Sequence, residues 1–432
     1  MQLASAPASI DAVSALRRGA CPSLAAPMAT GDGLLARFRP VNGEMSVAEL
    51  LAIAHAAERF GNGRIEVTSR GNLQLRGIRP EAVPALEDAV LAAMEIATGV
   101  PVETPPLAGL DPTERTDPRP LAAALRQAIA AEGLSGRVSP KVSVIADGAG
   151  ALRLDHLAAD LRLVAGDAGW SVSFGGERIE AALSSDAAVE AALEGLRRLA
   201  AAGSMVRARE LVARKRDLKA GVPGRIVGRH GLADGTLALG LAFGFGGIDA
   251  TVLRGFLDEA AALGAEQIRP GFAHTLLLIG LDEAQAGQLA ALAAEHDLVS
   301  DAADPRLAIA ACPGIGRCAS SRIDTAGLAA AMAAGASELF DDGLFVHVSG
   351  CIKGCAHAAR APLAFAGLDG GRCRLVINGR AGDNGAAELD PAQLAPGLAK
   401  LARLFRDGRH AQETVSEWLA RIEQREIAAA FA

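Results

Sequence analysis

The 432-residue sequence predicts an α+β fold that is duplicated about a pseudo-twofold axis, each half being a ferredoxin-like split βαβ unit followed by a second αβ unit. Two observations predict this fold. First, the chain repeats itself: residues 63–78 resemble residues 266–281, and pairs such as Ile65 with Ile268 share one shift of 203 positions. Second, each copy opens with the order strand, helix, two strands and helix, which is the core of a split βαβ unit.

The first of these units can be derived element by element. Residues 34–40, "LLARFRP", alternate in polarity like a half-buried strand. A helix is expected next, because Ser46 and Glu49 form a capping box ahead of apolar residues at helical spacing, and Gly61 is placed to end it. Two further strands, "RIEVTS" and "NLQLRGI", flank a turn, and "EAVPALEDAVLAA" forms a second helix. The second copy is expected to follow the same plan.

The constant shift, which we take to run without gaps, divides the chain into six segments. The basic stretch between the halves is expected to form a solvated helix and a linker, or else to dock an acidic electron donor. The predicted segments are an N-terminal segment (1–30), the ferredoxin-like unit of repeat 1 (31–97), its αβ unit (98–206), the inter-repeat helix and linker (207–234), the ferredoxin-like unit of repeat 2 (235–297) and a cysteine-bearing αβ unit (298–432).

Composition and charge argue against several classes of partner. A net charge of −7 disfavours non-specific binding to nucleic acid, and 3% aromatic residues poorly supply a platform for stacking bases. No uncharged apolar run approaches the roughly 18 residues that span a bilayer, and no secretory signal is recognisable. Six cysteines in a chain of this length indicate ligands or buried groups rather than disulfides. We therefore expect a cytoplasmic protein without nucleic-acid or membrane partners.

Four of the cysteines form a ligand pattern in the second copy only. Cys312 and Cys318 are spaced C-x5-C, Cys351 and Cys355 are spaced C-x3-C, and both pairs lie in predicted loops. Four thiolates from two loops suit a 4Fe-4S cluster, in which each iron takes one cysteine. A structural zinc site and simple burial of small apolar side chains are the alternatives. In the gapless register the residues opposite these cysteines are Gly109, Arg115, Gly148 and Leu152.

The remaining thiols and the nearby histidines are less informative. Cys373 lies in a predicted strand and is expected in the core, whereas Cys21 has no partner at motif spacing and leaves a thiol role near a pocket open. His347 and His357 flank the C-x3-C pair. They could be ligands or proton donors, but hydrogen-bonded structural histidines are the more common case.

Arginines show the opposite asymmetry, since they gather in the first copy. Arg37 and Arg39 share one face of their strand, and their repeat mates are Gly240 and Ala242. Arg70 likewise falls on an alanine of the second copy. Helices cover one face of such a sheet, so these cations lie on the open face. Because arginine binds carboxylates through paired hydrogen bonds, the pattern predicts an anion site, the alternative being solvated surface charge.

Three further cations belong to the predicted site. Lys141 begins the strand whose repeat mate leads into Cys351, so it is expected across the pseudo-twofold axis from the cluster. Arg317 and Lys353 stand between the cysteines of each pair. They would offset the negative charge of a thiolate-ligated cluster, contact the substrate, or do both.

With these residues in place, the chain resembles the sulfite and nitrite reductase superfamily along nearly its whole length. The resemblance is carried by the doubled architecture, "TSRGNLQLRG" (68–77), Pro140 with Lys141, and the two cysteine pairs. It implies a sulfite/nitrite reductase-like fold with a cluster beside sirohaem, a tetrapyrrole whose carboxylates are held by arginine and lysine. Arg70 and Lys141 match two such positions.

Two segments are similar to a branch of this superfamily that acts in aerobic cobalamin biosynthesis: residues 19–40 and residues 347–367. This resemblance implies an oxygen-dependent monooxygenase that hydroxylates the tetrapyrrole precorrin-3A at C20 and closes a γ-lactone. It also implies a 4Fe-4S cluster, a mononuclear non-haem iron, and an electron donor that is an NADH-linked reductase or ferredoxin-type protein. In this interpretation Arg37, Arg39, Arg70 and Lys141 hold substrate carboxylates. No two-histidine, one-carboxylate motif marks ligands for the second iron, which could come partly from the substrate.

Two other functions remain open from the sequence. A sirohaem-dependent sulfite or nitrite reductase would share the architecture and the cluster. A non-catalytic iron-sulfur electron carrier or tetrapyrrole-binding protein would share the residues without the reaction.

Overall fold

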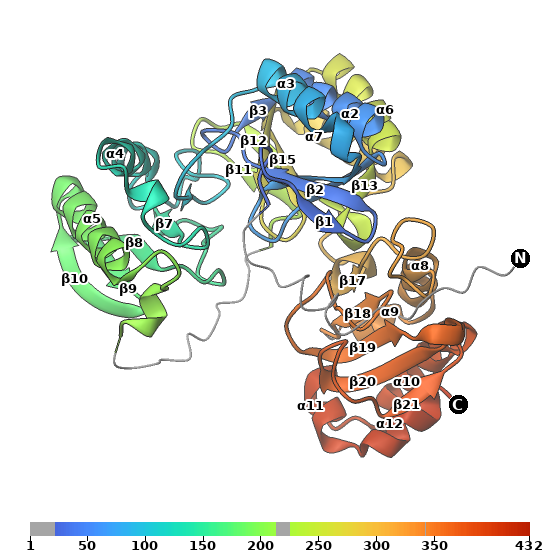
Figure 1. Ribbon diagram of the computed structural model, residues 1–432. Coiled ribbons are helices and arrows are strands. Elements are labelled where there is room, and N and C mark those ends of the chain that lie inside the picture. Colours follow the sequence, from blue (N-terminus) through green and yellow to red (C-terminus); the bar gives the residue numbers. More distant parts are fainter. Residues whose placement is uncertain (1–21, 213–224, 342) are drawn as a thin grey trace, which may run out of the picture.

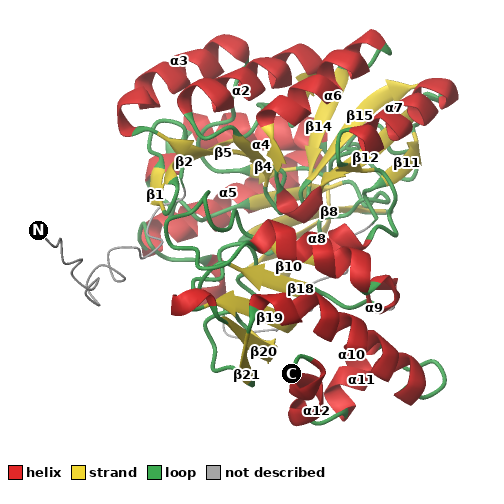
Figure 2. Ribbon diagram, turned by 90° about the vertical axis from the view of Figure 1, so that its right-hand side faces the viewer, coloured by secondary structure: helices red, strands yellow, loops and turns green. Residues whose placement is uncertain are grey.

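The computed structural model describes residues 22–212, 225–341 and 343–432, which form four β-sheets with helices packed against them (Figures 1 and 2). Cys21 lies outside these ranges. Two sheets lie together at the top of Figure 1, a third lies to one side in green, and a fourth lies below in orange and red. We number them sheets 1 to 4 in the order described below.

Sheet 1 is built mainly from the first repeat and follows the order β1-β2-β5-β4-β13. Helix α2 begins after Ser46, whose side chain accepts from the backbone of Glu49 in a capping box, and ends at Gly61, as predicted. Residue Gly71 turns the chain between β4 and β5 with a φ of 73°, a conformation that favours glycine. The elements are β1 (Met28–Thr30), β2 (Gly33–Phe38), β3 (Met45–Ser46), α2 (Val47–Phe60), β4 (Arg64–Val67), β5 (Leu73–Ile78) and α3 (Val83–Ala93).

Sheet 2 is built from the second repeat in the corresponding order, β11-β12-β15-β14-β3. The elements of this part of the second repeat are β11 (Gly228–Gly231), β12 (Leu237–Phe243), β13 (Ile248–Asp249), α6 (Ala250–Ala262), β14 (Gln267–Gly271), β15 (Thr275–Leu281), α7 (Glu283–Glu295) and β16 (Leu298–Val299). Strand β16 pairs with β12, and β13 belongs to sheet 1. Each repeat contributes one short strand to the sheet of the other repeat: β13 pairs with β4 through Ile248 and Ile65, and β3 pairs with β14 through Met45 and Ile268. The two pairings exchange under the shift of 203, so the predicted duplication is a symmetry of the structure.

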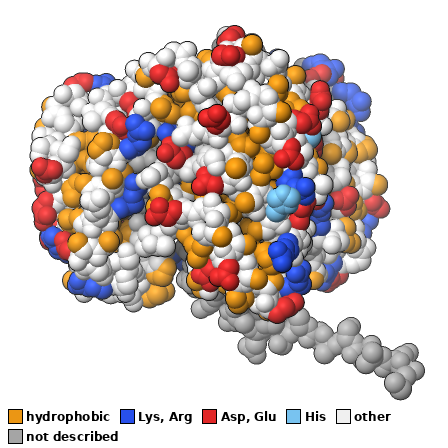
Figure 3. Space-filling model, turned by 90° about the horizontal axis from the view of Figure 1, so that it is seen from above, with side chains coloured by type: hydrophobic (Ala, Val, Ile, Leu, Met, Phe, Trp, Pro, Cys, Tyr) orange, Lys and Arg blue, Asp and Glu red, His pale blue; other side chains and the backbone are white. Residues whose placement is uncertain are grey.

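Helices α2, α3, α6 and α7 cover one face of sheets 1 and 2 and close a single apolar core shared by both repeats (Figure 2). Ala36 and Phe38 of β2 point into this core, so the alternate residues Arg37 and Arg39 lie on the opposite face, as the alternation predicts. On the helix side, seen from above in Figure 3, acidic and basic side chains are intermixed with apolar ones. The chemistry of interest is therefore on the faces that these helices leave open.

Sheets 3 and 4 are the second αβ units and share one topology, with three parallel strands followed by antiparallel ones. Sheet 3 and its helices comprise β6 (Val102–Glu103), α4 (Arg119–Ala131), β7 (Val144–Asp147), β8 (Leu161–Gly166), β9 (Gly169–Phe174), β10 (Glu177–Leu183) and α5 (Ser185–Ala202). Sheet 4 and its helices comprise β17 (Ile309–Ala311), α8 (Thr325–Gly335), α9 (Ser337–Asp341), β18 (Val346–Ser349), β19 (Ala361–Gly367), β20 (Cys373–Gly379), β21 (Ala387–Leu389), α10 (Leu394–Gly408), α11 (Val415–Arg421) and α12 (Gln424–Ala430).

The gapless register is wrong at the first two strands of these units. Val144, the first residue of β7, pairs with Val102 in sheet 3, and Val346, the first residue of β18, pairs with Ile309 in sheet 4. The shift is therefore 309 − 102 = 207 at the first strand and 346 − 144 = 202 at the second. The second repeat thus holds four more residues before the first strand and five fewer between the two strands. Cys312 and Cys318 therefore stand opposite Pro105 and Asp111, and Cys351 and Cys355 stand opposite Ala149 and Arg153, not opposite the residues of the gapless register.

The segment between the repeats also differs from the prediction. The helix expected from residue 207 lies partly outside the described residues, and its described start is a single 3-10 turn, Ala208–Glu210. Where a linker was expected, Gly228–Gly231 forms strand β11 and pairs with β12. Among the residues described, none of the helices combines the length and apolar character needed to cross a bilayer.

Candidate functional site

The four cysteines of the ligand pattern lie in two loops of the fourth sheet. Cys312 directly follows β17 and Cys351 follows β18 after one residue, so both leave the carboxyl ends of adjacent parallel strands. Cys318 lies in the loop after Cys312, and Cys355 in the loop after Cys351. Carboxyl ends of neighbouring parallel strands meet at one sheet edge, which is why residues 39 positions apart in sequence come together.

Cys312 has the most protected thiol environment of the four. Its sulfur accepts a hydrogen bond from the backbone N–H of Gly350 at 3.1 Å. Burial raises the pKa of the Cys312 thiol, and the nearby Cys351 and Cys318 sulfurs raise it further. The three sulfurs are thus close enough for the charge of one thiolate to raise the pKa of another. A bound cation or iron-sulfur cluster would stabilise the thiolate forms.

The described residues do not form a ready-made site for a single metal ion. Among the described residues, no group of three or more His, Cys, Asp or Glu side chains is placed to hold one metal ion. A zinc site needs four ligands around one atom, whereas a 4Fe-4S cluster needs one thiolate at each iron. None of the five cysteines in the described ranges forms a disulfide. Cys373 differs from the four loop cysteines, since it is fully buried in the apolar core and burial raises its pKa to about 12.

The cysteine loops pack against the first repeat. The turn between β1 and β2 reaches the loop that carries Cys318: the backbone N–H of Ala319 donates to the carbonyl of Gly31 at 2.7 Å. A Cβ atom on Gly31 would lie 2.5 Å from the Cys318 sulfur. At the open face of sheet 1, Arg76 lies near enough to Cys355 for the two charges to interact. The structure thus brings the cysteines of one repeat to the arginine-bearing sheet of the other.

The open face of sheet 1 is a polar network rather than a row of bare cations. Arg37 donates to Gln74 Oε1 at 2.7 and 3.1 Å, and Gln74 in turn donates to Glu66. Arg76 donates to both carboxylate oxygens of Asp32 at 2.8 and 2.9 Å. These acceptors were not among the residues predicted from the sequence. The comparison of repeat mates that identified the arginines would also have identified them, since Asp32, Glu66 and Gln74 have Gly235, Arg269 and Leu277 as repeat mates.

Arg39 and Arg70, predicted to hold an external carboxylate, are bound by an internal one. Glu103 of β6 is 3% exposed and accepts from Arg70 Nε at 3.0 Å, with Arg39 Nη2 at 3.5 Å. Arg70 also donates to the carbonyl of Ala158 at 2.9 Å and to the Ser143 hydroxyl at 3.3 Å. Glu103 thus offsets the charge of both guanidiniums from within the protein.

The remaining predicted cations lie at the edges of this region. Lys141 is exposed and lies in the turn before β7, two residues from the Ser143 that Arg70 contacts. Arg317 is half exposed with its guanidinium 3.8 Å from the Asp249 carboxylate, and Lys353 donates to the Ser320 hydroxyl at 3.0 Å. Arg317 therefore connects its cysteine loop to Asp249, and Lys353 connects the two cysteine loops to each other.

The cysteine loops also expose apolar side chains. Ile315 stands between Cys312 and Cys318 and is 57% exposed, and Ile352 stands between Cys351 and Cys355 and is 55% exposed. Isoleucine is usually buried, so two exposed isoleucines in neighbouring loops mark a surface suited to an apolar partner.

His347 does not follow the expectation of a hydrogen-bonded structural histidine. It is fully buried on β18, and neither ring nitrogen has a hydrogen-bond partner among the described residues. Burial lowers its pKa to about 4, with a smaller contribution from His357, whose ring lies 5.7 Å away. His357 Nε2 contacts the carbonyl of Arg360 at 3.4 Å. His347 is therefore neutral over the physiological pH range.

The corresponding face of sheet 2 is covered and largely apolar, although Arg269, the mate of Glu66, is buried there and donates to the carbonyls of Pro106 and Ala108. Leu277 and Ile279, the mates of Gln74 and Arg76, pack with Leu107 and Ile145 of the first αβ unit in one buried cluster. The same positions therefore serve packing in one repeat and polar chemistry in the other.

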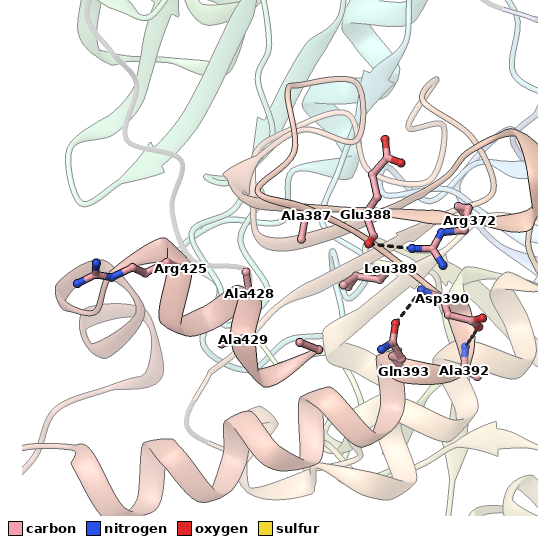
Figure 4. Close-up of a pocket in the computed structure, with 11 residues that line it drawn as sticks. Arg372, Ala387, Glu388, Leu389, Asp390, Ala392, Gln393, Arg425, Ala428 and Ala429 are labelled. Carbon is pink, nitrogen blue, oxygen red and sulfur yellow. Dashed lines mark hydrogen bonds between the residues drawn. The ribbon is translucent and has the colours of Figure 1, made fainter.

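A surface cavity of about 880 Å³ lies away from this region, between β21 and α12 (Figure 4). Its charged lining residues, such as Arg372, Glu388 and Arg425, are exposed to solvent, and alanines make up much of the rest. None of the loop cysteines or predicted cations lines it. We assign it no chemistry.

Comparison with known proteins first defines the class. Residues 26–93 match the nitrite/sulfite reductase ferredoxin-like half domain. The structure is similar to that of the Mycobacterium tuberculosis NirA protein, with a TM-score of 0.70 and 21% identity, covering 91% of this chain and 84% of that one. A 119-residue stretch is 34% identical to a ferredoxin–nitrite reductase from Leptolyngbya laminosa, covering 25% of this chain and 22% of that protein. The chain therefore has the fold of the sulfite and nitrite reductases.

A further similarity is more specific. The chain is 40% identical over 440 aligned residues to a precorrin-3B synthase from Sinorhizobium sp, covering 97% of this chain and 95% of that protein. The chain belongs to the precorrin-3B synthase family.

Proposed function

We propose that this chain is an oxidoreductase that converts precorrin-3A to precorrin-3B in cobalamin biosynthesis, in the cytoplasm. One oxygen atom of O₂ is inserted at C20 and the other leaves as water, which requires two electrons from a donor and two protons. The γ-lactone then forms from a side-chain carboxylate of the substrate. The observation that carries the proposal is the meeting of the cysteine loops with the arginine-bearing face of sheet 1, in a chain of this family.

Cys312, Cys318, Cys351 and Cys355 would hold a 4Fe-4S cluster, which supplies one-electron transfer when bound. The N–H of Gly350 would stabilise the Cys312 thiolate, since charge-assisted hydrogen bonds to thiolate favour the ionised form. Any mononuclear iron would need ligands from outside the described residues or from the substrate. Sirohaem belongs to the alternative function.

The substrate would lie between the two surfaces. A tetrapyrrole has apolar faces and a rim of carboxylates, so Ile315 and Ile352 suit a macrocycle face. Arg37, Arg39, Arg70 and Lys141 would bind carboxylates at the rim, and Arg317 and Lys353 could reach others. The network of sheet 1 contains five arginines, at positions 37, 39, 64, 70 and 76, against three carboxylates, and so keeps excess positive charge. Fixing one meso carbon against the oxidant is the main task of such a site.

The test begins with anaerobically purified protein. Iron and acid-labile sulfide are measured together with the visible spectrum. Incubation with precorrin-3A, a reductant and ¹⁸O₂ is then followed by mass spectrometry. We expect iron-sulfur absorption alone and a product that gains one labelled oxygen atom.

The control compares two serines. Cys351→Ser should lose iron and sulfide, whereas Cys373→Ser should retain both, because Cys373 is buried in the core. Added sirohaem bands in the wild type would favour the reductase. An unchanged substrate mass, with the cluster present, would favour the non-catalytic electron carrier or tetrapyrrole-binding protein.

A further inference from the structure

We propose that the β1–β2 turn of the first repeat, with Arg76, is a positioning element of the cluster site: Gly31 makes room for the Cys318 thiolate, and the Asp32–Arg76 pair sets the charge beside the cluster. This inference rests on the proposed cluster. It adds first-repeat residues to a site whose thiols all come from the second repeat.

Gly31 leaves space that no other residue could leave. An ideal Cβ at this position would lie 2.5 Å from the Cys318 sulfur and 3.2 Å from the Ser320 hydroxyl. Its carbonyl accepts the Ala319 N–H at 2.7 Å, which fixes the turn directly against the residue after Cys318. The turn cannot retreat from an added methyl group without breaking this hydrogen bond.

Asp32, the next residue along the turn, forms a buried ion pair with Arg76. Asp32 is held by both Nε and Nη2 of Arg76, and the two side chains are 2% and 10% exposed. Burial acts to lower the pKa of Arg76, but the carboxylates of Glu66 and Asp32 and the thiolate of Cys355 together raise it. Arg76 therefore stays charged, and this buried cation is close enough to Cys355 for the two charges to interact, with little screening by water.

The other repeat provides a comparison without a cluster. Its β11–β12 turn makes an analogous contact with the first αβ unit, where the Ala233 N–H donates to the carbonyl of Leu110 at 2.9 Å. Leu110 directly precedes Asp111, the residue opposite Cys318 in the corrected register, and it packs against an apolar cluster. The mate of Arg76 there is Ile279. The docking of turn on loop is thus common to both repeats, whereas the contact of a glycine with a cysteine sulfur is made at the Cys318 loop, and the position of Arg76 is occupied by Ile279 in the other repeat.

The steric part is tested by Gly31→Ala, with Gly136→Ala as the matched control, because a Cβ on Gly136 meets nothing within 4 Å. Iron and sulfide per chain are measured after anaerobic purification. We expect Gly31→Ala to lose most of its cluster and Gly136→Ala to keep it. Full cluster content in Gly31→Ala would overturn this part. Absence of a cluster from the wild type would instead overturn the proposed function.

The electrostatic part is tested by the cluster midpoint potential in two variants of opposite sign. Arg76→Gln removes a positive charge and should shift the potential to more negative values, because reduction adds an electron to an already negative cluster. Asp32→Asn removes a negative charge and should shift it to more positive values. Arg79→Gln, at an exposed arginine, should leave it unchanged.

Opposite shifts of the midpoint potential would indicate a charge effect. A general loosening of the structure around the cluster would shift the potential of both variants in the same direction. Shifts of one sign, or no shift, would overturn the electrostatic part. If Arg76→Gln does not hold a cluster, Arg76→Lys decides: a retained cluster with near wild-type potential supports the role of charge, and loss in both variants refutes it.

Discussion

Replacing Arg70 should expose how much of the site depends on Glu103. Arg70→Met removes the guanidinium that donates to Glu103, Ser143 and the carbonyl of Ala158. Glu103 is 3% exposed and would keep only Arg39, at 3.5 Å. Removing one partner of a buried ion pair costs about 3–5 kcal/mol, because it leaves an uncompensated charge. Since Arg39 remains and Arg70 itself is 29% exposed, we expect about 2–3 kcal/mol.

A second substitution shows whether the stranded carboxylate is the cause. In Arg70→Met with Glu103→Gln the buried carboxylate is removed, and Arg39, whose side chain is 19% exposed, keeps its hydrogen bond to the backbone carbonyl of residue 70. We therefore expect a smaller loss than in Arg70→Met alone, about 1 kcal/mol, which is typical for lost hydrogen bonds. Urea unfolding followed by Trp170, which is buried in the same αβ unit as Glu103, measures these differences in a Trp418→Phe background. Arg79→Met, which breaks an exposed pair with Glu81 and an exposed hydrogen bond to the carbonyl of Arg59, should change stability by less than about 1 kcal/mol.

The same variants separate stability from binding. If Arg70 also contacts a substrate carboxylate, the double variant should regain stability but bind a polycarboxylate tetrapyrrole more weakly than the wild type, while its iron and sulfide content is unchanged. A double variant as unstable as Arg70→Met would refute the explanation that the unpaired Glu103 carboxylate causes the loss of stability. Loss of the cluster in either variant would mean that Arg70 has been assigned to the wrong part of the site.

Two further changes test the loops at the strand ends. Gly350→Ala should lower iron and sulfide per chain, because its Cβ would lie 2.0 Å from the Ser321 hydroxyl and 3.3 Å from the Cys312 sulfur, whereas Gly231→Ala, with nothing within 4 Å, should not. Burial raises the pKa of Glu114 to about 7, so the stability that its protonated form contributes at low pH is lost as the pH rises through 7. The urea midpoint should therefore fall more between pH 5.5 and pH 8 in the wild type than in Glu114→Gln. Equal falls in the two proteins would contradict this reasoning.

The regular elements could be predicted because their signals are local. Ser46 and Glu49 cap α2 through neighbouring residues, and the alternation around Arg37 places it on the open face whatever lies opposite. The duplication was visible because the strands and helices of the two ferredoxin-like units keep similar lengths and one constant shift. The register failed between α7 and β17, where four extra residues lie in segments with no periodic pattern to align.

The partners of the site residues could not be predicted, since they come from distant segments. Glu103 binds Arg70 across 33 positions, and Asp32 binds Arg76 across 44. The sequence shows each charge but not which opposite charge the fold brings to it. His347 illustrates the same limit: its polar side chain suggested a hydrogen bond, but strand pairing buries it without one.

The two copies need different faces for a physical reason. A face that packs two units together is most stable when apolar, as with Leu277 and Ile279 against Leu107, because each buried polar group would need a partner. A face that receives a charged ligand needs the opposite, namely cations held in place by internal carboxylates, as Asp32 and Glu103 do here. One sheet cannot meet both requirements at the same positions. Duplication removes the conflict, since sheet 2 anchors the first αβ unit while sheet 1 keeps its polar face toward the cysteine loops.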